Sequence, residues 1–346
     1  MIRKATGNLL QADAEALVNT VNCDGFMGKG IALQFKQAWP ENFEAYAKAC
    51  RADEVRPGQM FIWETGRMMN PRYIVNFPTK RHWRGKARME DICSGLRALV
   101  SDARRLGIRS IAVPPLGCGN GGLDWENVRP LIESAFADLP NVEVQLFSPL
   151  GGPDAKAMPV NTRRPAMTIS RALFVKVMHQ YESMSYRLTL LEIQKLGYFL
   201  QEAGEPLKLR FEAGLYGPYA PNLNKVLERI EGHLIRGYGD SQKPDTDIAL
   251  LPDAVREANT FLSKHPLPIS RVNRVGELIQ GFETPYGMEL LSSVHWVCVH
   301  GKPKATTPGA ALESVHKWNE RKLKMLRPEH TRIAYQRLRD LAWIPK

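Results

Sequence analysis

Short apolar runs alternate with segments of helical periodicity through the first half of the chain. Runs rich in β-branched residues predict strands at Ala16–Asn22, Tyr73–Phe77, Ser110–Pro114 and Val142–Phe147. Apolar positions spaced three and four apart predict helices at Ile31–Cys50, Met89–Leu106 and Val128–Ala137. Strands and helices in this alternating order indicate an α/β fold with a largely parallel central sheet.

The pattern becomes helical in the second half. The predicted helices are Arg171–Met184, Thr189–Glu202, Asn222–Glu231, Asp253–Ser263, Ser270–Gly281, Pro285–Val299 and Glu313–Lys324. Between the halves, Pro149–Arg164 contains proline, glycine and charge without periodicity, which predicts a linker. We therefore expect an α/β domain at residues 1–150, a linker at 151–165 and a basic, mainly α-helical domain at 166–346.

The net charge of +11 is concentrated in the second half. Residues 1–155 contain 19 Lys and Arg against 17 Asp and Glu, a net of +2, whereas residues 156–346 contain 28 against 19, a net of +9. Such a surplus indicates a surface that meets an acidic partner, either a nucleic acid or an acidic protein face. A solvated basic surface without a partner is the alternative.

The composition excludes several classes of protein. With 346 residues and 44% hydrophobic content, the chain can bury the cores of two globular domains, which excludes disorder and fibrous structure. No run approaches the ~20 apolar residues that span a bilayer, and no secretory pattern opens the chain, so we expect a cytoplasmic protein with no membrane partner. The five cysteines are scattered, and we expect reduced thiols. His295, Cys298 and His300 are spaced so that they do not share one helix face, and no metal site is expected.

A glycine-rich loop follows the first predicted strand and reads NCDGFMGKG from Asn22 to Gly30. Its glycines let the backbone approach a ligand, and the helix that follows presents amides and the positive end of its dipole to an anion. The glycine spacing matches neither the dinucleotide fingerprint nor the Walker pattern. Taken alone, the loop is either a phosphate or polyol site or a tight structural connection.

A second glycine-rich loop follows the strand predicted at Ser110–Pro114 and reads PLGCGNGGL from Pro115 to Leu123. Four glycines within six positions cost chain entropy unless the backbone needs special dihedral angles or close approach of a ligand. Consecutive amides of such a loop can wrap a diphosphate, and a long flexible turn is the alternative. Both loops lie at the carboxyl ends of predicted strands, where open α/β sheets bind their ligands.

The two loops together resemble the ligand loops of macrodomains, the modules that bind ADP-ribose. The resemblance covers about residues 1–150 and implies a three-layer α/β/α fold with a mixed central sheet and no metal or redox cofactor. The positions that it implies for ADP-ribose binding are Asn8, Leu9, Asn22, Met27, Gly28, Lys29, Gly30, Gly117, Cys118, Gly119, Asn120, Gly121, Gly122 and Leu123. Many macrodomains contact adenine through an aspartate near the first of these positions, where this chain has Asn8.

Within that family, the segment NFPTKRHWR from Asn76 to Arg84, together with GNLL from Gly7 and the first glycine loop, resembles the DarG-type antitoxins of DarT–DarG toxin–antitoxin systems. The resemblance implies an ADP-ribosyl glycohydrolase that hydrolyses the N-glycosidic bond of ADP-ribose attached to thymidine. It implies ADP-ribosylated single-stranded DNA as substrate, ADP-ribose as product and the cognate toxin DarT as partner. It also implies that Lys80 is the key catalytic residue and that Asn22 holds the distal ribose.

The residue chemistry of Lys80 is consistent with that role. Lys80 follows a predicted strand and directly precedes the basic run Arg81–Lys86, whose charges would favour a neutral amine. A neutral amine can attack the anomeric carbon and form a transient covalent adduct, and Lys80 can instead act electrostatically on the departing base. A phosphate-contacting cation is the alternative role for Lys80.

Two further roles stay open. Asn22 either hydrogen-bonds the hydroxyls of the distal ribose or caps a turn. A related lysine-dependent group of macrodomains has an acidic residue in the second glycine loop, where this chain has Gly121. Asp124, three residues later, either replaces that acid or caps the helical turn that follows it.

The run RHWRGKAR from Arg81 to Arg88 interleaves cations with an aromatic residue. Such a run suits the backbone of a single-stranded nucleic acid, with Trp83 available to stack a base. DNA contacts are therefore assigned to Thr79, Arg81, His82 and Trp83. A solvated loop whose tryptophan packs locally is the alternative.

In the second half, Leu190–Leu200 followed by Gly214–Ala220 resembles the Panacea-type antitoxin fold, which neutralises toxins by direct contact. DarG proteins use this region to bind the toxin, so the resemblance assigns toxin binding to residues 166–346. An apolar stripe at this spacing is also typical of a helical core.

Three functions are compatible with these residues. The first is a DNA ADP-ribosyl glycohydrolase that also binds its toxin. The second is a hydrolase of protein-linked or acylated ADP-ribose, and the third is a non-catalytic ADP-ribose reader. The lysine at a strand end and the linked basic domain favour the first.

Overall fold

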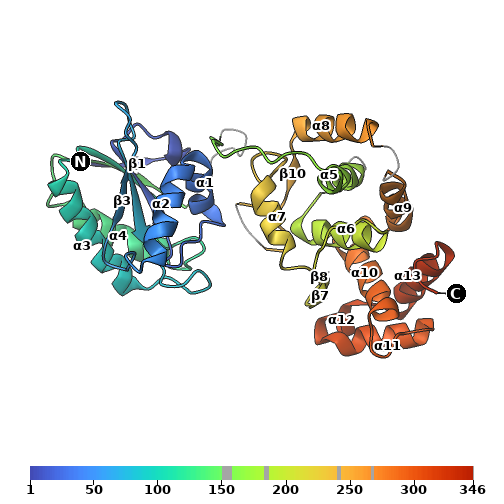
Figure 1. Ribbon diagram of the computed structural model, residues 1–346. Coiled ribbons are helices and arrows are strands. Elements are labelled where there is room, and N and C mark those ends of the chain that lie inside the picture. The colour runs from blue at the N-terminus through green and yellow to red at the C-terminus, as the bar shows by residue number, and fades with distance from the viewer. Residues whose placement is uncertain (150–157, 183–186, 240–242, 266–268, 346) are drawn as a thin grey trace. The chain divides into compact units, whose positions relative to one another are not determined.

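The computed structural model describes residues 1–149, 158–182, 187–239, 243–265 and 269–345. They form two compact units (Figure 1). The first contains Met1–Arg163 and Gly239, and the main boundary lies between Arg163 and Arg164. That boundary lies within the predicted linker, of which residues 151–157 are outside the described residues. The described linker residues before Arg164 belong to the first unit, and the Asn161 side chain donates to the Ala38 carbonyl at 2.7 Å.

A six-stranded sheet forms the centre of the first unit. Its strands are β1 (Ile2–Ala5), β2 (Ala16–Val21), β3 (Phe61–Glu64), β4 (Tyr73–Pro78), β5 (Ser110–Val113) and β6 (Glu143–Phe147). They lie in the order β1-β6-β5-β2-β4-β3, and all neighbours are parallel except β3 and β4. β2 and β4 are buried on both faces, which explains why their sequences are continuous apolar runs.

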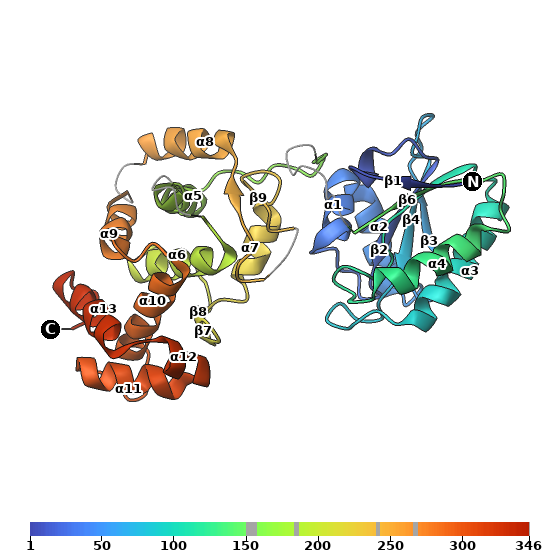
Figure 2. The ribbon, with the colours of Figure 1, turned by 180° about the vertical axis from the view of Figure 1, so that it is seen from behind.

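Helices cover both faces of this sheet (Figure 2). α3 (Met89–Arg105) and α4 (Trp125–Phe136) pack on one face, where Phe77, Leu96 and Val128 share a buried cluster. α1 (Gly30–Ala38) packs on the other face through Phe35, and α2 (Pro40–Arg51) follows it. The arrangement confirms the predicted macrodomain fold with three layers and a mixed sheet.

Three elements of this unit differ from the sequence prediction. The single helix predicted at Ile31–Cys50 is wrong, because α1 ends at Ala38 and α2 begins at Pro40. Proline lacks the backbone N–H that a helix interior needs, and it is favoured at the first helical position. β1 and β3 were not predicted, since each lies at an edge of the sheet and has no buried residue, so neither has the apolar run of a buried strand.

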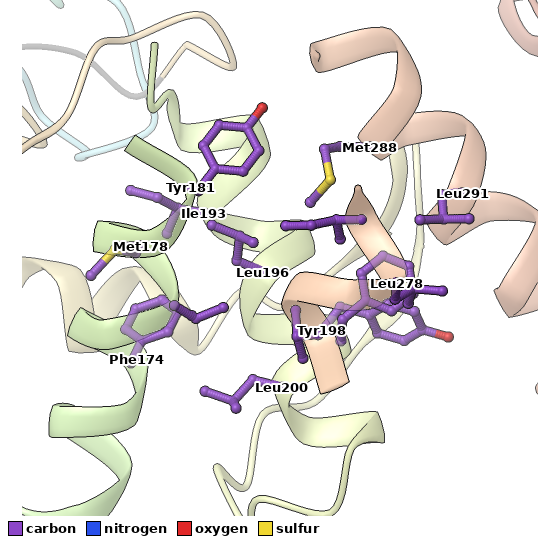
Figure 3. Packing of buried hydrophobic residues seen from close by; sticks show 14 of the residues in the cluster. Phe174, Met178, Tyr181, Ile193, Leu196, Tyr198, Leu200, Leu278, Met288 and Leu291 are labelled. Carbon is purple, nitrogen blue, oxygen red and sulfur yellow. The ribbon is translucent and has the colours of Figure 1, made fainter. Parts of the chain in front are cut away.

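The second unit is mainly α-helical, as predicted. Its helices are α5 (Ile169–Glu182), α6 (Leu190–Glu202), α7 (Leu223–Ile230), α8 (Pro252–Ser263), α9 (Ile269–Ile279), α10 (Pro285–Val299), α11 (Pro308–Trp318), α12 (Glu320–Met325) and α13 (Pro328–Asp340). Two short strand pairs join them, β7 (Glu212–Gly214) with β8 (Gly217–Tyr219) and β9 (Ile235–Arg236) with β10 (Ala249–Leu250). The core forms around α6, whose residues Leu190–Leu200 are all buried (Figure 3).

Most of the predicted helices of this unit agree with the structure within a few residues, but the last does not. The helix predicted at Glu313–Lys324 is divided into α11 and α12, because Asn319 leaves the helical conformation and its Oδ1 accepts from the Lys322 amide at 2.9 Å. α13 was not predicted. Met184, the predicted end of the first helix, lies outside the described residues. No described helix is both long and apolar enough to cross a membrane.

A glycine in α3 tests the packing that supports the sheet. A Cβ at Gly95 would lie 2.3 Å from Cζ of Phe77 on β4, so the ring would have to move within a packed core. We expect Gly95→Ala to lower the free energy of unfolding by about 1–3 kcal/mol in urea denaturation. Gly119→Ala is the control, because an added Cβ there meets no heavy atom within 4 Å. Equal stability of the two variants would contradict this packing.

Candidate active site

Three loops meet at one end of the sheet because they follow neighbouring parallel strands. β2 pairs with β4, with Val21 opposite Pro78, and pairs with β5 on its other side. The loops after these strands therefore emerge at the same edge. The two glycine loops approach each other, since a Cβ at Gly30 would lie 3.2 Å from Nδ2 of Asn120.

Asn22 closes the first glycine loop with its side chain. Its Oδ1 accepts from the backbone amides of Asp24 at 2.9 Å and Phe26 at 3.3 Å, and its Nδ2 donates to the Phe26 carbonyl at 2.6 Å. The Tyr46 hydroxyl donates to the Asn22 carbonyl at 2.6 Å. These bonds give Asn22 the turn-capping role. An amide nitrogen carries two hydrogens, so a second one is available to donate to a ribose hydroxyl.

The start of α1 brings a cation to the site. Gly30, its first residue, has φ of +55°, a left-handed conformation that glycine adopts without strain. Lys29 occupies the N-cap position with a half-buried side chain, and burial lowers the pKa of its amine. The positive end of the α1 dipole and Lys29 together favour an anionic ligand group here.

The second glycine loop folds back on itself. The Leu123 amide donates to the Gly117 carbonyl at 3.0 Å, and a Cβ at Gly121 would lie 2.3 Å from that same oxygen. The Ala87 amide donates to the Gly121 carbonyl at 3.0 Å, which bonds this loop to the segment after β4. The glycine at 121 is thus required by the packing of the loop itself, a reason that the sequence pattern did not reveal. Burial raises the pKa of the Cys118 thiol in this loop to about 11.

Lys80 lies half-buried just beyond the end of β4. Its Nζ donates a long hydrogen bond of 3.5 Å to the Trp83 carbonyl. Burial lowers the pKa of the Lys80 amine, because an ammonium loses hydration, and the positive charge of Lys29 lowers it further. The direction agrees with the predicted neutral amine. The cause differs, because Lys29 from the first glycine loop acts on Lys80 rather than the adjacent basic run Arg81–Lys86.

The basic run after Lys80 has two parts. Arg81 forms a two-bond ion pair with the buried carboxylate of Asp91, at 3.1 Å and 2.9 Å, and so fastens the loop to α3. His82 and Trp83 are exposed. Arg84 places its guanidinium 4.5 Å from the centroid of the Trp83 ring. The exposed part therefore combines cations with an aromatic face.

Three of the predicted contact residues have buried side chains. Leu9 is 5% exposed, Met27 1% and Thr79 3%. For Leu9 and Met27 only the backbone can meet a ligand. The Thr79 hydroxyl lies 3.4 Å from the Val21 carbonyl, to which it donates. Thr79 therefore leaves the set of side chains that we assign to DNA contact, because its side chain does not reach solvent.

Two polar residues of the predicted site cap helices. The Oδ1 of Asn8 accepts from the Leu10 amide at 3.0 Å, at the start of a 3₁₀ helix (Leu9–Gln11). The Oδ1 of Asp124 accepts from the Glu126 amide at 3.1 Å, at the start of α4. Of the two roles considered for Asp124, its side chain therefore has the helix-capping one. Asparagine and aspartate are both strong N-cap residues. Asn8 can therefore cap this helix as an aspartate at the same position would.

Asp24 is a site residue that sequence reasoning missed. Its Oδ2 accepts from the Trp83 amide at 2.7 Å and lies 3.8 Å from Nε2 of His82. It thereby joins the first glycine loop to the loop that carries Lys80. The Asn-Cys-Asp-Gly sequence marks Asp24 as a turn residue. It does not indicate that the Asp24 carboxylate binds the Trp83 amide, 59 positions away.

His295 is part of the core of the second unit. Its Nδ1 lies 2.7 Å from the Tyr198 hydroxyl and its Nε2 lies 3.2 Å from the Trp343 carbonyl. Burial lowers the pKa of His295 to about 3, which keeps the ring neutral. Within the described ranges, no three His, Cys, Asp or Glu side chains gather around a common point that suits a metal ion.

Comparisons with known proteins relate the chain to one family. The Macro domain family model matches residues 18–132. A DNA ADP-ribosyl glycohydrolase of Thermus aquaticus is 46% identical over 323 residues, which cover 93% of this chain and 89% of that protein. A DNA ADP-ribosyl transferase-DNA ADP-ribosyl glycohydrolase fusion protein of Thermosipho africanus is 33% identical over 159 residues, covering 42% of this chain and 41% of that protein. The solved macrodomain of Mycobacterium tuberculosis DarG is 55% identical, covers 43% of this chain and 98% of its own, and has a TM-score of 0.43.

The electrostatic coupling of Lys29 to Lys80 can be tested by chemical labelling. Because the charge of Lys29 lowers the pKa of Lys80, Lys29→Gln should raise that pKa and move the midpoint of Lys80 acetylation to higher pH. Competitive labelling with acetic anhydride across a pH series, read by mass spectrometry, measures the midpoint. Lys48→Gln, an exposed lysine on α2, is the control and should leave it in place. A midpoint that Lys29→Gln does not raise would contradict the coupling.

Proposed function

This chain belongs to the DarG-type DNA ADP-ribosyl glycohydrolases, and we propose that it removes ADP-ribose from thymidine in single-stranded DNA. The observation that carries the proposal is the half-buried amine of Lys80, which lies just beyond β4 beside the loop that begins at Asn22. A lysine with a lowered pKa at a strand end is suited to chemistry on a sugar carbon.

The glycine loops would hold the ADP-ribose group. The start of α1 would offer the diphosphate the positive end of a helix dipole, while the Gly30 amide itself donates to the Gly239 carbonyl. In the second glycine loop the amides of Gly119–Gly121 would bind the diphosphate, because those of Cys118, Gly122 and Leu123 already donate to carbonyls at Pro115–Gly119. The second amide hydrogen of Asn22 is available to the distal ribose. This arrangement would present the anomeric carbon of that ribose to the Lys80 amine.

The reaction is hydrolysis of the N-glycosidic bond. The bond between the anomeric carbon and the thymine nitrogen breaks, the nitrogen takes a proton, and water supplies the hydroxyl that the ribose carries afterwards. Lys80 acts either as a neutral nucleophile that forms a transient adduct displaced by water, or as a charge that stabilises the departing base. The exposed side chains of Arg81, His82 and Trp83 would bind the DNA strand beside the amine. The Arg84 cation would join them, and the ion pair of Arg81 with Asp91 holds their loop in place.

The second unit would bind the toxin DarT. Residues 164–346 contain 26 Lys and Arg against 19 Asp and Glu, a net charge of +7, which suits an acidic partner face. The similar Thermosipho africanus protein is, by its name, a fusion of a DNA ADP-ribosyl transferase with a DNA ADP-ribosyl glycohydrolase. We assign the protein to the cytoplasm, since its DNA substrate and its toxin would both be there.

Release of ADP-ribose from modified DNA tests this function. The wild type should free ADP-ribose from a DarT-modified thymidine oligonucleotide and leave an ADP-ribosylated protein largely intact. Lys80→Ala should lower the rate on DNA by about 10²- to 10⁴-fold, because the reacting amine is lost. Chromatographic detection of free ADP-ribose measures both rates, with Lys48→Ala as the matched lysine control.

Two results would overturn the proposal. A folded wild type that binds ADP-ribose but frees none from either substrate would be a reader. Release from the modified protein and not from DNA would favour a protein ADP-ribose hydrolase.

A further inference from the structure

Two large aromatic side chains lie exposed beside Lys80. Phe26, in the first glycine loop, is 57% exposed, and Trp83, in the loop after β4, is 40% exposed. Their ring centroids are 6.0 Å apart, with the ring planes inclined by 59°. Single exposed apolar residues are common on protein surfaces, but a contacting pair that two separate loops contribute is an informative surface feature.

Hydrogen bonds fix the backbone positions that carry this pair. The Asn22 side chain binds both the amide and the carbonyl of Phe26, at 3.3 Å and 2.6 Å. The Asp24 carboxylate accepts from the backbone amide of Trp83 at 2.7 Å and so joins the two loops. Loops whose backbone is already fixed lose little conformational entropy when a ligand covers their side chains.

The surroundings of the pair are cationic. The Arg84 guanidinium lies 4.5 Å from the centroid of the Trp83 ring, and the Lys80 Nζ lies 3.5 Å from the Trp83 carbonyl. The His82 ring centroid is 5.9 Å from that of Trp83. A nucleic acid strand matches this combination, because its bases stack on aromatic rings and its phosphates attract cations. A wholly apolar partner would leave the cations without a counterpart.

We propose that Phe26 and Trp83 form an aromatic platform on which a base of single-stranded DNA stacks, next to the ADP-ribosylated nucleotide. This inference rests on the proposed function and adds Phe26 to it. Because the Lys80 amine contacts the backbone of Trp83, a base on the platform holds the strand beside that amine. The platform acts on the binding of DNA and takes no part in the chemistry at the anomeric carbon.

The test is the kinetics of Phe26→Ala in the full chain. Loss of one stacking ring should raise KM for an ADP-ribosylated oligonucleotide by about 5- to 150-fold and leave kcat unchanged. Phe26→Tyr keeps an aromatic ring and should retain the wild-type KM. Met68→Ala is the control for removal of an exposed apolar side chain, because Met68 is 101% exposed and precedes β4 at its other end.

An ADP-ribosylated thymidine nucleotide without flanking bases separates stacking from a general defect. Phe26→Ala should keep the wild-type KM on this substrate. An unchanged KM on the oligonucleotide, or an equal rise on both substrates, would overturn the platform.

A second measurement separates this inference from the proposed function. If the wild type releases no ADP-ribose from DNA, the proposed function fails, and fluorescence anisotropy of a labelled, unmodified oligonucleotide still tests the platform. A higher Kd for Phe26→Ala than for the wild type would support it. Equal Kd values, or no binding by either protein, would overturn it.

Discussion

The parallel pairing of β2 with β4 is the constraint on which the site depends. Neighbouring strands of a sheet lie about 4.8 Å apart, and Val21 stands opposite Pro78 at the end of the pair. The loops that carry Asn22 and Lys80 therefore begin side by side. A slip of one residue would move every side chain of the slipped strand to the opposite face, and different helices pack on the two faces, so the packing fixes this register.

Hydrogen bonds between the loops that follow β2, β4 and β5 fix their positions relative to one another. The Cys23 thiol contacts the Lys80 carbonyl at 3.4 Å, Asp24 binds the Trp83 amide, and Ala87 binds the second glycine loop. These bonds hold the Lys80 amine in a half-buried position, where it is incompletely hydrated and is repelled by the positive charge of Lys29. Both effects disfavour the ammonium form, so the fold itself alters the chemistry of an otherwise ordinary lysine.

Much of the fold and the main loops could be predicted from local pattern. Buried strands such as β2 and β4 are recognisable because both faces demand apolar residues, and the polar loops at their ends mark the site. Edge strands such as β1 have no buried residue and therefore lack that signal. The bonds of Asp24 with Trp83 and of Arg81 with Asp91, and the influence of Lys29 on Lys80, depend on contacts between distant segments, which no local pattern contains.

The central claim is that the Lys80 amine performs the chemistry on ADP-ribosylated DNA. The most direct measurement is the single-turnover rate of ADP-ribose release from modified DNA across the pH range in which Lys80 itself titrates. The account predicts a rate that follows that titration with the same midpoint, rising with pH if the neutral amine attacks and falling if the ammonium acts by its charge. A rate that stays constant through the Lys80 midpoint would contradict it.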